Sequence, residues 1–260
     1  MQAPNPEADA PLVPGRVAIF TDFDGTLVEI APTPDGVAPP PRLAEDLARL
    51  AAALNGALAI VTGRRIADID HYLAPATLPV AGSHGAERRR VDGSLEPADD
   101  QLLTAAAEMA RMLAPLALQH RGLLIEAKPA TVALHYRQAP ELAELCLTAA
   151  TNLATRYSEF MVMKGKMVLE LRPRRFGKGE AVRAFMAEAP FRGRLPIFLG
   201  DDATDEDAFV AVQALGGVGV KIGAGQSVAR MRIPDVPRVR RFLGGIAALA
   251  DQEPGAGAAT

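Results

Sequence analysis

Carboxylates follow two apolar runs of the sequence, at the points where each run gives way to a polar loop. Asp22 and Asp24 come just after the apolar residues 17–20. Asp201 follows the apolar residues 195–199. Carboxylates that are brought together repel one another, and a hard divalent cation with oxygen ligands relieves that repulsion. Magnesium normally binds through one or two carboxylates and a substrate phosphate, so this pattern indicates Mg²⁺-assisted phosphoryl chemistry.

Two further groups are suited to binding a phosphate. Thr62 follows the apolar residues 58–61 and, with Gly63, can offer a hydroxyl and backbone N–H groups. Lys178 stands between two glycines at an expected helix start and can bring a positive charge. Carboxylates, magnesium, a hydroxyl and a lysine are together what phosphoryl transfer requires.

The elements that must position these residues alternate between strand and helix from residue 17 to 81, and again after residue 173. This rhythm predicts a doubly wound parallel sheet, in which ligands bind beyond the carboxyl ends of the strands. Between the two stretches, two helix-plus-hairpin units predict a small antiparallel sheet with its helices on one face. We therefore expect an α/β fold with a Rossmann-like, doubly wound parallel sheet core (16–88 and 173–250). We also expect an inserted α+β cap (89–172) and flexible tails (1–15 and 251–260).

Charged and apolar residues alternate along the expected strands of the cap. The apolar faces must meet the cap helices, which leaves one sheet face lined with charges. Charges of both signs favour a sugar ligand, because hydroxyls both donate and accept hydrogen bonds. A solvated sheet face is the alternative interpretation. The charged positions are Glu126, Lys128, His135, Arg137, Glu170 and Arg172.

Composition excludes several classes of function. The 260 residues include 28 basic and 31 acidic ones, a net charge of −3 that gives no bulk attraction to nucleic acid or anionic membranes. The single cysteine, Cys146, excludes an internal disulfide framework. No apolar run approaches the ~18 residues of a membrane span, and the first 15 residues lack the features of a signal peptide. We expect a cytoplasmic monomer with no nucleic-acid or membrane partner, and the three arginines 88–90 are interpreted as a solvated strand flank.

The sequence Asp-Phe-Asp-Gly-Thr-Leu at 22–27, placed after an apolar strand, resembles the first motif of the haloacid dehalogenase superfamily of phosphatases. Thr62, Lys178 and Gly200-Asp201-Asp202 match its second, third and fourth motifs in the same order. The resemblance covers essentially the whole chain from Val17 onwards.

This resemblance implies a role for each carboxylate. Asp22 attacks the phosphorus and forms an aspartyl-phosphate. Asp24 protonates the leaving group and then deprotonates the hydrolytic water. Asp22, the backbone carbonyl of Asp24, and Asp201 hold the Mg²⁺ ion. Asp202 and Asp205 support the loop, and a helix N-cap is an equal alternative for Asp205.

A narrower resemblance concerns the substrate. The insertion after the second motif resembles type 2 caps on sugar phosphatases, and residues 82–87, 125–128, 169–173 and 200–206 look like trehalose-6-phosphate phosphatases. In that family a cap Glu-x-Lys, a following arginine and a later glutamate hold the disaccharide. The matching residues here are Glu126, Lys128, Arg137 and Glu170.

Three residues near the expected phosphate site complete the substrate-binding set. His84 and Gly85 are expected to approach the ligand closely, although a turn histidine is an alternative for His84. Arg64 either binds the phosphate or pairs with a carboxylate.

The family resemblance implies Mg²⁺-dependent hydrolysis of trehalose 6-phosphate to trehalose and phosphate, as in trehalose biosynthesis. The same chemistry on another phosphosugar, such as sucrose phosphate or mannosyl-phosphoglycerate, is the nearest alternative. A catalytically silent, phosphosugar-binding regulator is an alternative of another class. The presence of Asp22, Asp24, Lys178 and Asp201 argues against it, because a silent protein has no need of them.

Overall fold

The chain divides into two compact units. The computed structural model describes residues 13–31, 36–96, 99–128, 130–165 and 167–250. One unit, the core, comprises the described parts of 1–95 and 177–260, and the other, the cap, comprises those of 96–176. The expected leader at 1–12 and the tail at 251–260 lie outside the described residues. Pro14–Arg16, partly within the expected leader, instead forms a short 3-10 helix, η1.

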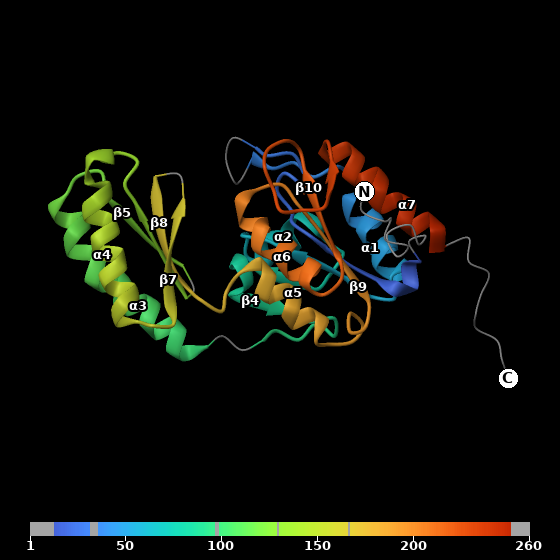
Figure 1. Ribbon diagram of the computed structural model, residues 1–260, viewed down its shortest axis with the longest axis horizontal. Coiled ribbons are helices and arrows are strands. Elements are labelled where there is room, and N and C mark those ends of the chain that lie inside the picture. The colour runs from blue at the N-terminus through green and yellow to red at the C-terminus, as the bar shows by residue number, and fades with distance from the viewer. Residues whose placement is uncertain (1–12, 32–35, 97–98, 129, 166, 251–260) are drawn as a thin grey trace, which may run out of the picture. The chain divides into compact units, whose positions relative to one another are not determined.

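The core contains a seven-stranded sheet in the order β11-β10-β9-β1-β2-β3-β4. Figure 1 labels β10, β9 and β4 of this sheet. All neighbouring strands are parallel except β3 and β4, which are antiparallel. This confirms the predicted α/β fold. In chain order the strands are β1 (Val17–Thr21), β2 (Leu58–Val61), β3 (Val80–Gly82), β4 (Glu87–Arg89), β9 (Leu195–Gly200), β10 (Val218–Ile222) and β11 (Met231–Ile233).

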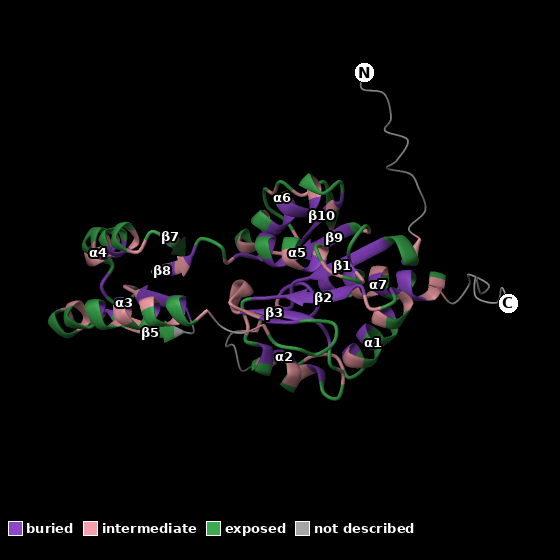
Figure 2. Ribbon diagram, turned by 90° about the horizontal axis from the view of Figure 1, so that it is seen from below, coloured by how far each residue is buried: buried purple, intermediate pink, exposed green. Residues whose placement is uncertain are grey.

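Helices cover both faces of this sheet, which is why its central strands are apolar throughout (Figure 2). All residues of β1 and β2 are buried. The helix α5 contacts α6, and α1 contacts both α2 and α7. The core helices are α1 (Leu43–Ala53), α2 (Ile66–Leu73), α5 (Lys178–Met186), α6 (Glu206–Ala214) and α7 (Val236–Ala250).

The cap is a four-stranded antiparallel sheet in the order β5-β6-β8-β7, with two helices. The apolar side chains of Val132, Leu134, Leu169 and Leu171 join Cys146 and other helix residues in one hydrophobic cluster. The alternation of apolar and polar positions therefore predicted correctly which sheet face meets the helices. The cap elements are α3 (Asp100–Gln119), β5 (Leu124–Lys128), β6 (Thr131–His135), α4 (Ala143–Arg156), β7 (Phe160–Gly165) and β8 (Val168–Pro173).

The first cap helix, α3, begins at Asp100. The side chain of Asp99 caps it by accepting hydrogen bonds from the backbone N–H groups of Gln101 and Leu102. The edge strand β11, which has only three residues, was not predicted. In the part of the chain that the structure describes, no helix is long and apolar enough to span a bilayer.

Candidate active site

Asp22 lies directly beyond the carboxyl end of β1, at the centre of the core sheet. Its backbone N–H donates to the carbonyl of Leu199 on β9, which joins the ends of the two strands (2.8 Å). Gly25 allows the loop after β1 to approach Asp201. A Cβ atom at Gly25 would lie 2.2 Å from Oδ2 of Asp201, and the glycine has a φ of +72°. The carboxylates after β1 and after β9 are therefore neighbours.

Lys178 places a buried ammonium between two carboxylates. It begins α5, and its side chain is 2% exposed. Its Nζ donates to Oδ1 of Asp205 at 2.7 Å and lies 3.0 Å from Oδ2 of Asp22. Burial alone would lower the pKa of Lys178, but Asp22 and Asp205 outweigh that effect and raise it. Lys178 is therefore charged at neutral pH.

Asp205 holds the loop that follows β9. Its side chain is fully buried, and its Oδ2 accepts hydrogen bonds from the backbone N–H groups of Asp201 (2.9 Å) and Asp202 (3.0 Å). The N-cap of the next turn is Asp202, whose Oδ1 accepts from the N–H and the hydroxyl of Thr204. Asp205 does occupy the N-cap position of α6, as the alternative expected, but its side chain makes no cap hydrogen bond there. Its contacts order the loop and neutralise Lys178.

Oxygen atoms of Asp22, Asp201 and Asp205 lie within 4.8 Å of one another. Burial raises the pKa of Asp22 to about 6, against the opposing effect of Lys178. Burial also raises the pKa of Asp201 to about 6, with Asp202 and Asp205 adding to the effect. For Asp205, burial and the charge of Asp22 raise the pKa to about 7. These shifts reflect burial first and neighbouring negative charge second. An all-carboxylate donor set suits a hard divalent cation.

Arg64 pairs with a carboxylate, which is one of the two alternatives expected for it. Its Nε and Nη2 donate to Oδ2 and Oδ1 of Asp24 at 2.6 and 2.8 Å. The guanidinium carbon lies 5.0 Å from the centroid of the Tyr72 ring. The buried Thr62 accepts a hydrogen bond on its Oγ1 from the backbone N–H of Arg64 (3.2 Å). The loop after β2 is thereby tied to the loop after β1.

His84 and Gly85 lie in the short turn Ser83–Gly85 after β3. The backbone N–H of His84 donates to the carbonyl of Thr62 (3.0 Å). A Cβ atom at Gly63 would lie 2.7 Å from Nε2 of His84, so the imidazole packs directly against this glycine. Gly85 has a φ of +94°, and a Cβ atom there would lie 3.3 Å from the carbonyl oxygen of Gly177. The turn therefore reaches both the loop of Thr62 and the residue before Lys178.

In the cap, Glu126 and Glu170 lie in one row across the sheet. Each pairs with Ala133, on either side of β6, so both side chains point from the same face. Nε2 of His135 lies 2.9 Å from Oε2 of Glu126. Arg137 was expected within a strand, but β6 ends at His135, so strand parity does not fix its direction; its side chain is exposed. Lys128 is the last residue of β5, and the structure describes its backbone but not its side chain.

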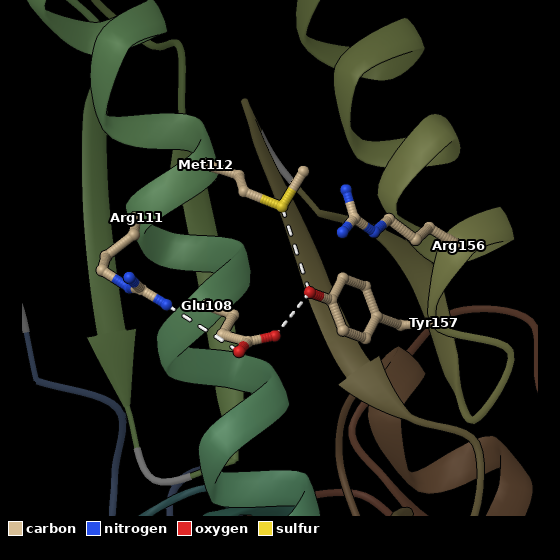
Figure 3. Close-up of a pocket in the computed structure, with 5 residues that line it drawn as sticks. All are labelled: Glu108, Arg111, Met112, Arg156 and Tyr157. Carbon is tan, nitrogen blue, oxygen red and sulfur yellow. Dashed lines mark hydrogen bonds and ion pairs between the residues drawn. The ribbon is translucent and has the colours of Figure 1, made fainter.

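The cap contains a cavity of about 430 Å³ that is lined by none of the predicted site residues (Figure 3). It is bounded by α3 and the end of α4, where the hydroxyl of Tyr157 donates to Glu108 (2.8 Å). The lining residues are Glu108, Arg111, Met112, Arg156 and Tyr157. None of the candidate site residues of the cap is among them.

The arginines at 88–90 had been expected to form a solvated strand flank, and this expectation was wrong for two of them. Arg88 is buried and pairs with Glu188 at 2.6 Å. Arg89 is also buried and makes two hydrogen bonds to Asp70, at 2.6 and 2.8 Å. Only Arg90 is exposed. The first two arginines therefore anchor the sheet edge, because each has a carboxylate partner far away in the sequence.

Lys221 is a buried charged residue near the site that the sequence interpretation missed. It lies in β10, and its Nζ donates to the backbone carbonyls of Ile222 (2.8 Å) and Asp201. The available signal was a single lysine within the apolar segment Val-Gly-Val-Lys-Ile.

Comparisons with known proteins agree on one family. The family model for trehalose-phosphatase matches residues 20–233. The chain is 42% identical over 240 residues to a trehalose-6-phosphate phosphatase of Escherichia coli, covering 92% of this chain and 89% of that protein. It is 43% identical over 237 residues to a probable trehalose-phosphate phosphatase of Sinorhizobium fredii, covering 90% and 87%.

A solved structure agrees with these sequence matches. The trehalose-6-phosphate phosphatase of Aspergillus fumigatus superimposes with a TM-score of 0.71 at 26% identity, covering 90% of this chain and 93% of that one. The similarity extends over nearly the whole described chain. It therefore includes both the acidic cluster at the strand ends and the separate antiparallel unit. The chain belongs to the trehalose-phosphatase family.

Proposed function

We propose that the protein is a phosphomonoester hydrolase that converts trehalose 6-phosphate and water to trehalose and inorganic phosphate. The observation that carries this proposal is the family match over residues 20–233, which includes both the acidic cluster of the core and the charged sheet face of the cap. The activity named for the similar bacterial proteins is the same. We further propose that it acts as a monomer in the cytoplasm.

Asp22 is the proposed nucleophile. An oxygen of its carboxylate attacks the phosphorus, and the bond from phosphorus to the sugar oxygen breaks. Asp24 donates a proton to that leaving oxygen and then takes a proton from the water that hydrolyses the aspartyl-phosphate. The second step releases phosphate and regenerates Asp22. The position of Asp22 beside the charged Lys178 supports this role, because Lys178 offsets negative charge at the reacting group.

The proposed cation is Mg²⁺, held by Asp22, Asp201 and the backbone carbonyl of Asp24. Asp205 is already engaged by Lys178 and two backbone N–H groups, so it and Asp202 are assigned to ordering the loop. When bound, Mg²⁺ neutralises charge on the phosphate and orients it. We assign Thr62, Arg64, His84 and Gly85 to the phosphate end of the substrate. Arg64 pairs with Asp24 in this structure. To contact the substrate, its guanidinium must therefore either leave Asp24 or bind Asp24 and the phosphate at the same time.

The cap residues Glu126, Lys128, Arg137 and Glu170 are proposed to bind the disaccharide. The shared row and shared face of Glu126 and Glu170 support this assignment, because two acceptors on one surface can bind neighbouring sugar hydroxyls. The phosphatase unit and the sugar-binding unit then correspond to the core and the cap.

A substrate panel tests the proposal. Phosphate release is measured with trehalose 6-phosphate, sucrose 6-phosphate, mannosyl-phosphoglycerate and glucose 6-phosphate, with Mg²⁺ and with excess chelator. We expect the highest kcat/KM for trehalose 6-phosphate, and no activity in chelator. A higher value for another phosphosugar would replace the substrate assignment, and no hydrolysis of any of them would favour a silent regulator. Full activity in excess chelator would contradict the proposal that the reaction requires a divalent cation.

A further inference from the structure

Lys221 carries a positive charge into the interior of the core sheet. Its neighbours along β10, Val220 and Ile222, are buried apolar residues, and Lys221 itself is 6% exposed. Burying an ammonium is costly unless its N–H groups are hydrogen-bonded or its charge is paired. A lysine at such a position therefore needs specific partners.

The partners of Lys221 are backbone carbonyls. Its Nζ donates to the carbonyl of Ile222, at the end of β10, and to that of Asp201, just beyond the end of β9. Within the described residues, no carboxylate lies within 4.0 Å of this nitrogen. Lys221 pairs in register with Gly200, the residue before Asp201. The ammonium of Lys221 therefore binds backbone carbonyls, one of them in the loop after β9, and not a carboxylate side chain.

The backbone of Asp201 is consequently held on both sides. Its N–H, and the N–H of Asp202, donate to Asp205, while its carbonyl accepts from Lys221. The carboxylate of Asp201 lies against Gly25, where there is no space for a Cβ atom. The peptide between Asp201 and Asp202 is thus fixed through both its N–H and its carbonyl, which restricts where the Asp201 side chain can point.

We propose that Lys221 is a positioning residue, which holds the backbone of Asp201 so that its carboxylate is presented to the divalent cation. This inference rests on the proposed function for the identity of that cation. Lys221 touches neither the cation nor the substrate and acts only through Asp201.

The direction of the effect separates this role from a purely electrostatic one. A positive charge near an acidic cluster repels a cation, so removing it would by itself strengthen Mg²⁺ binding. Lys221 also lowers the pKa of Asp201, so its removal would let protons compete more strongly for that carboxylate. The comparison is therefore made at about pH 8.5, where this competition is small, and weaker binding at that pH arises from a displaced ligand. A role confined to stabilising the sheet would lower the melting temperature but leave the dissociation constant of the folded protein unchanged.

The test is calorimetric titration of Mg²⁺ into the metal-free full-length protein without substrate. Lys221→Met removes the donor and the charge but keeps an unbranched side chain. We expect its Kd for Mg²⁺ to rise about 10- to 100-fold, the usual effect of losing a group that orients a ligand. Arg230→Met is the matched control, because it removes an exposed positive charge from the same part of the chain. Its Kd is expected to equal that of the wild type.

A second readout uses activity. The Mg²⁺ concentration for half-maximal phosphate release should rise in Lys221→Met, while kcat at saturating Mg²⁺ changes much less. If Lys221→Met does not fold, Lys221→Leu, which also has no donor, is titrated in its place with the same expectation. Unchanged or tighter Mg²⁺ binding in the folded variant would overturn the role of Lys221 alone. A wild-type protein that binds no Mg²⁺ would overturn the cation assignment, and this role with it.

Discussion

The acidic cluster of the core and the charged sheet face of the cap differ in how firmly their carboxylates are held. In the core, the side chains of Asp22, Lys178 and Asp205 are 7%, 2% and 0% exposed, and they contact one another directly. In the cap, Glu126 and His135 are 45% and 36% exposed. A buried, mutually bonded cluster has one geometry, whereas an exposed pair is solvated and adjusts at little cost.

This difference fits the two tasks proposed for the core and the cap. Chemistry at phosphorus needs reacting groups held in fixed geometry. The raised pKa values of Asp22 and Asp201 show that burial, with a smaller effect of neighbouring carboxylates, opposes their ionisation. Recognition of a sugar needs polar groups that can exchange water for hydroxyls. We therefore expect substitutions in the core to affect all phosphate esters and substitutions in the cap to affect the sugar ester alone.

The largest effect is expected for Asp22→Asn. The substitution removes the attacking oxygen and a cation ligand together, so turnover should fall by at least about 10,000-fold on both sugar and aryl phosphates. Steady-state phosphate release measures this, and a thermal melt confirms that the variant is folded. Substantial activity in the folded variant would rule out the covalent mechanism.

Asp24→Asn should have the next largest effect, and one that depends on the leaving group. General acid–base help is worth about 100- to 10,000-fold, so hydrolysis of trehalose 6-phosphate should fall by that factor. An aryl phosphate, whose leaving group needs no proton, should lose less in its phosphorylation step. Single-turnover rates with both substrates measure the difference. Glu29→Gln, which changes an exposed carboxylate five residues after Asp24, is the control. If the single-turnover rates on the two substrates fall by the same factor, Asp24 does not protonate the leaving group.

A smaller effect concerns pH and the stability of the metal-free protein. Burial raises the pKa values of Asp22 and Asp201 to about 6 and of Asp205 to about 7, above the ordinary value of 3.8. The folded state therefore holds protons that the unfolded state has released, so the free energy of unfolding should fall as the pH rises from about 4 to 7. A rise from 3.8 to about 6 in the pKa of one such carboxylate corresponds to about 3 kcal/mol.

Mg²⁺ should reverse this loss, because it replaces the protons. Melting temperatures in chelator and in Mg²⁺ at pH 5.5 and 7.5 measure the effect, and the stabilisation by Mg²⁺ should be larger at pH 7.5. Asp22→Asn should flatten the dependence on pH. A larger stabilisation at pH 5.5 would contradict the assignment of these carboxylates to the cation.

The sequence allowed the fold and the position of the acidic loops to be predicted, because those signals are local. Apolar runs identify buried strands, and the polar residues that follow them must meet at one edge of a parallel sheet. The partners of individual charges could not be predicted. Arg64 and Asp24 are 40 residues apart and Arg88 and Glu188 are 100 apart, so only the folded chain brings them together.

Lys221 and Arg137 show the same limit in opposite ways. Lys221 is charged within an apolar strand, and its partner is a backbone carbonyl that no sequence pattern marks. Arg137 continues the alternation of the preceding residues, but the strand ends two residues before it. The periodicity of apolar residues indicates which face of a strand or helix a residue occupies. It does not indicate the residue at which the strand or helix ends.

The division of tasks between core and cap is tested most directly by one ratio, kcat/KM for trehalose 6-phosphate over kcat/KM for an aryl phosphate. It is compared in the wild type, in Glu126→Ala, and in the control Glu144→Ala, which removes an exposed carboxylate from the cap helix α4. A hydrogen bond to a charged group is worth about 1.5–3 kcal/mol, so Glu126→Ala should lower the ratio by about 10- to 150-fold. Glu144→Ala should leave it unchanged. If the ratio for Glu126→Ala equals that of the wild type, the cap carboxylate is a solvated group and sugar selection does not depend on it.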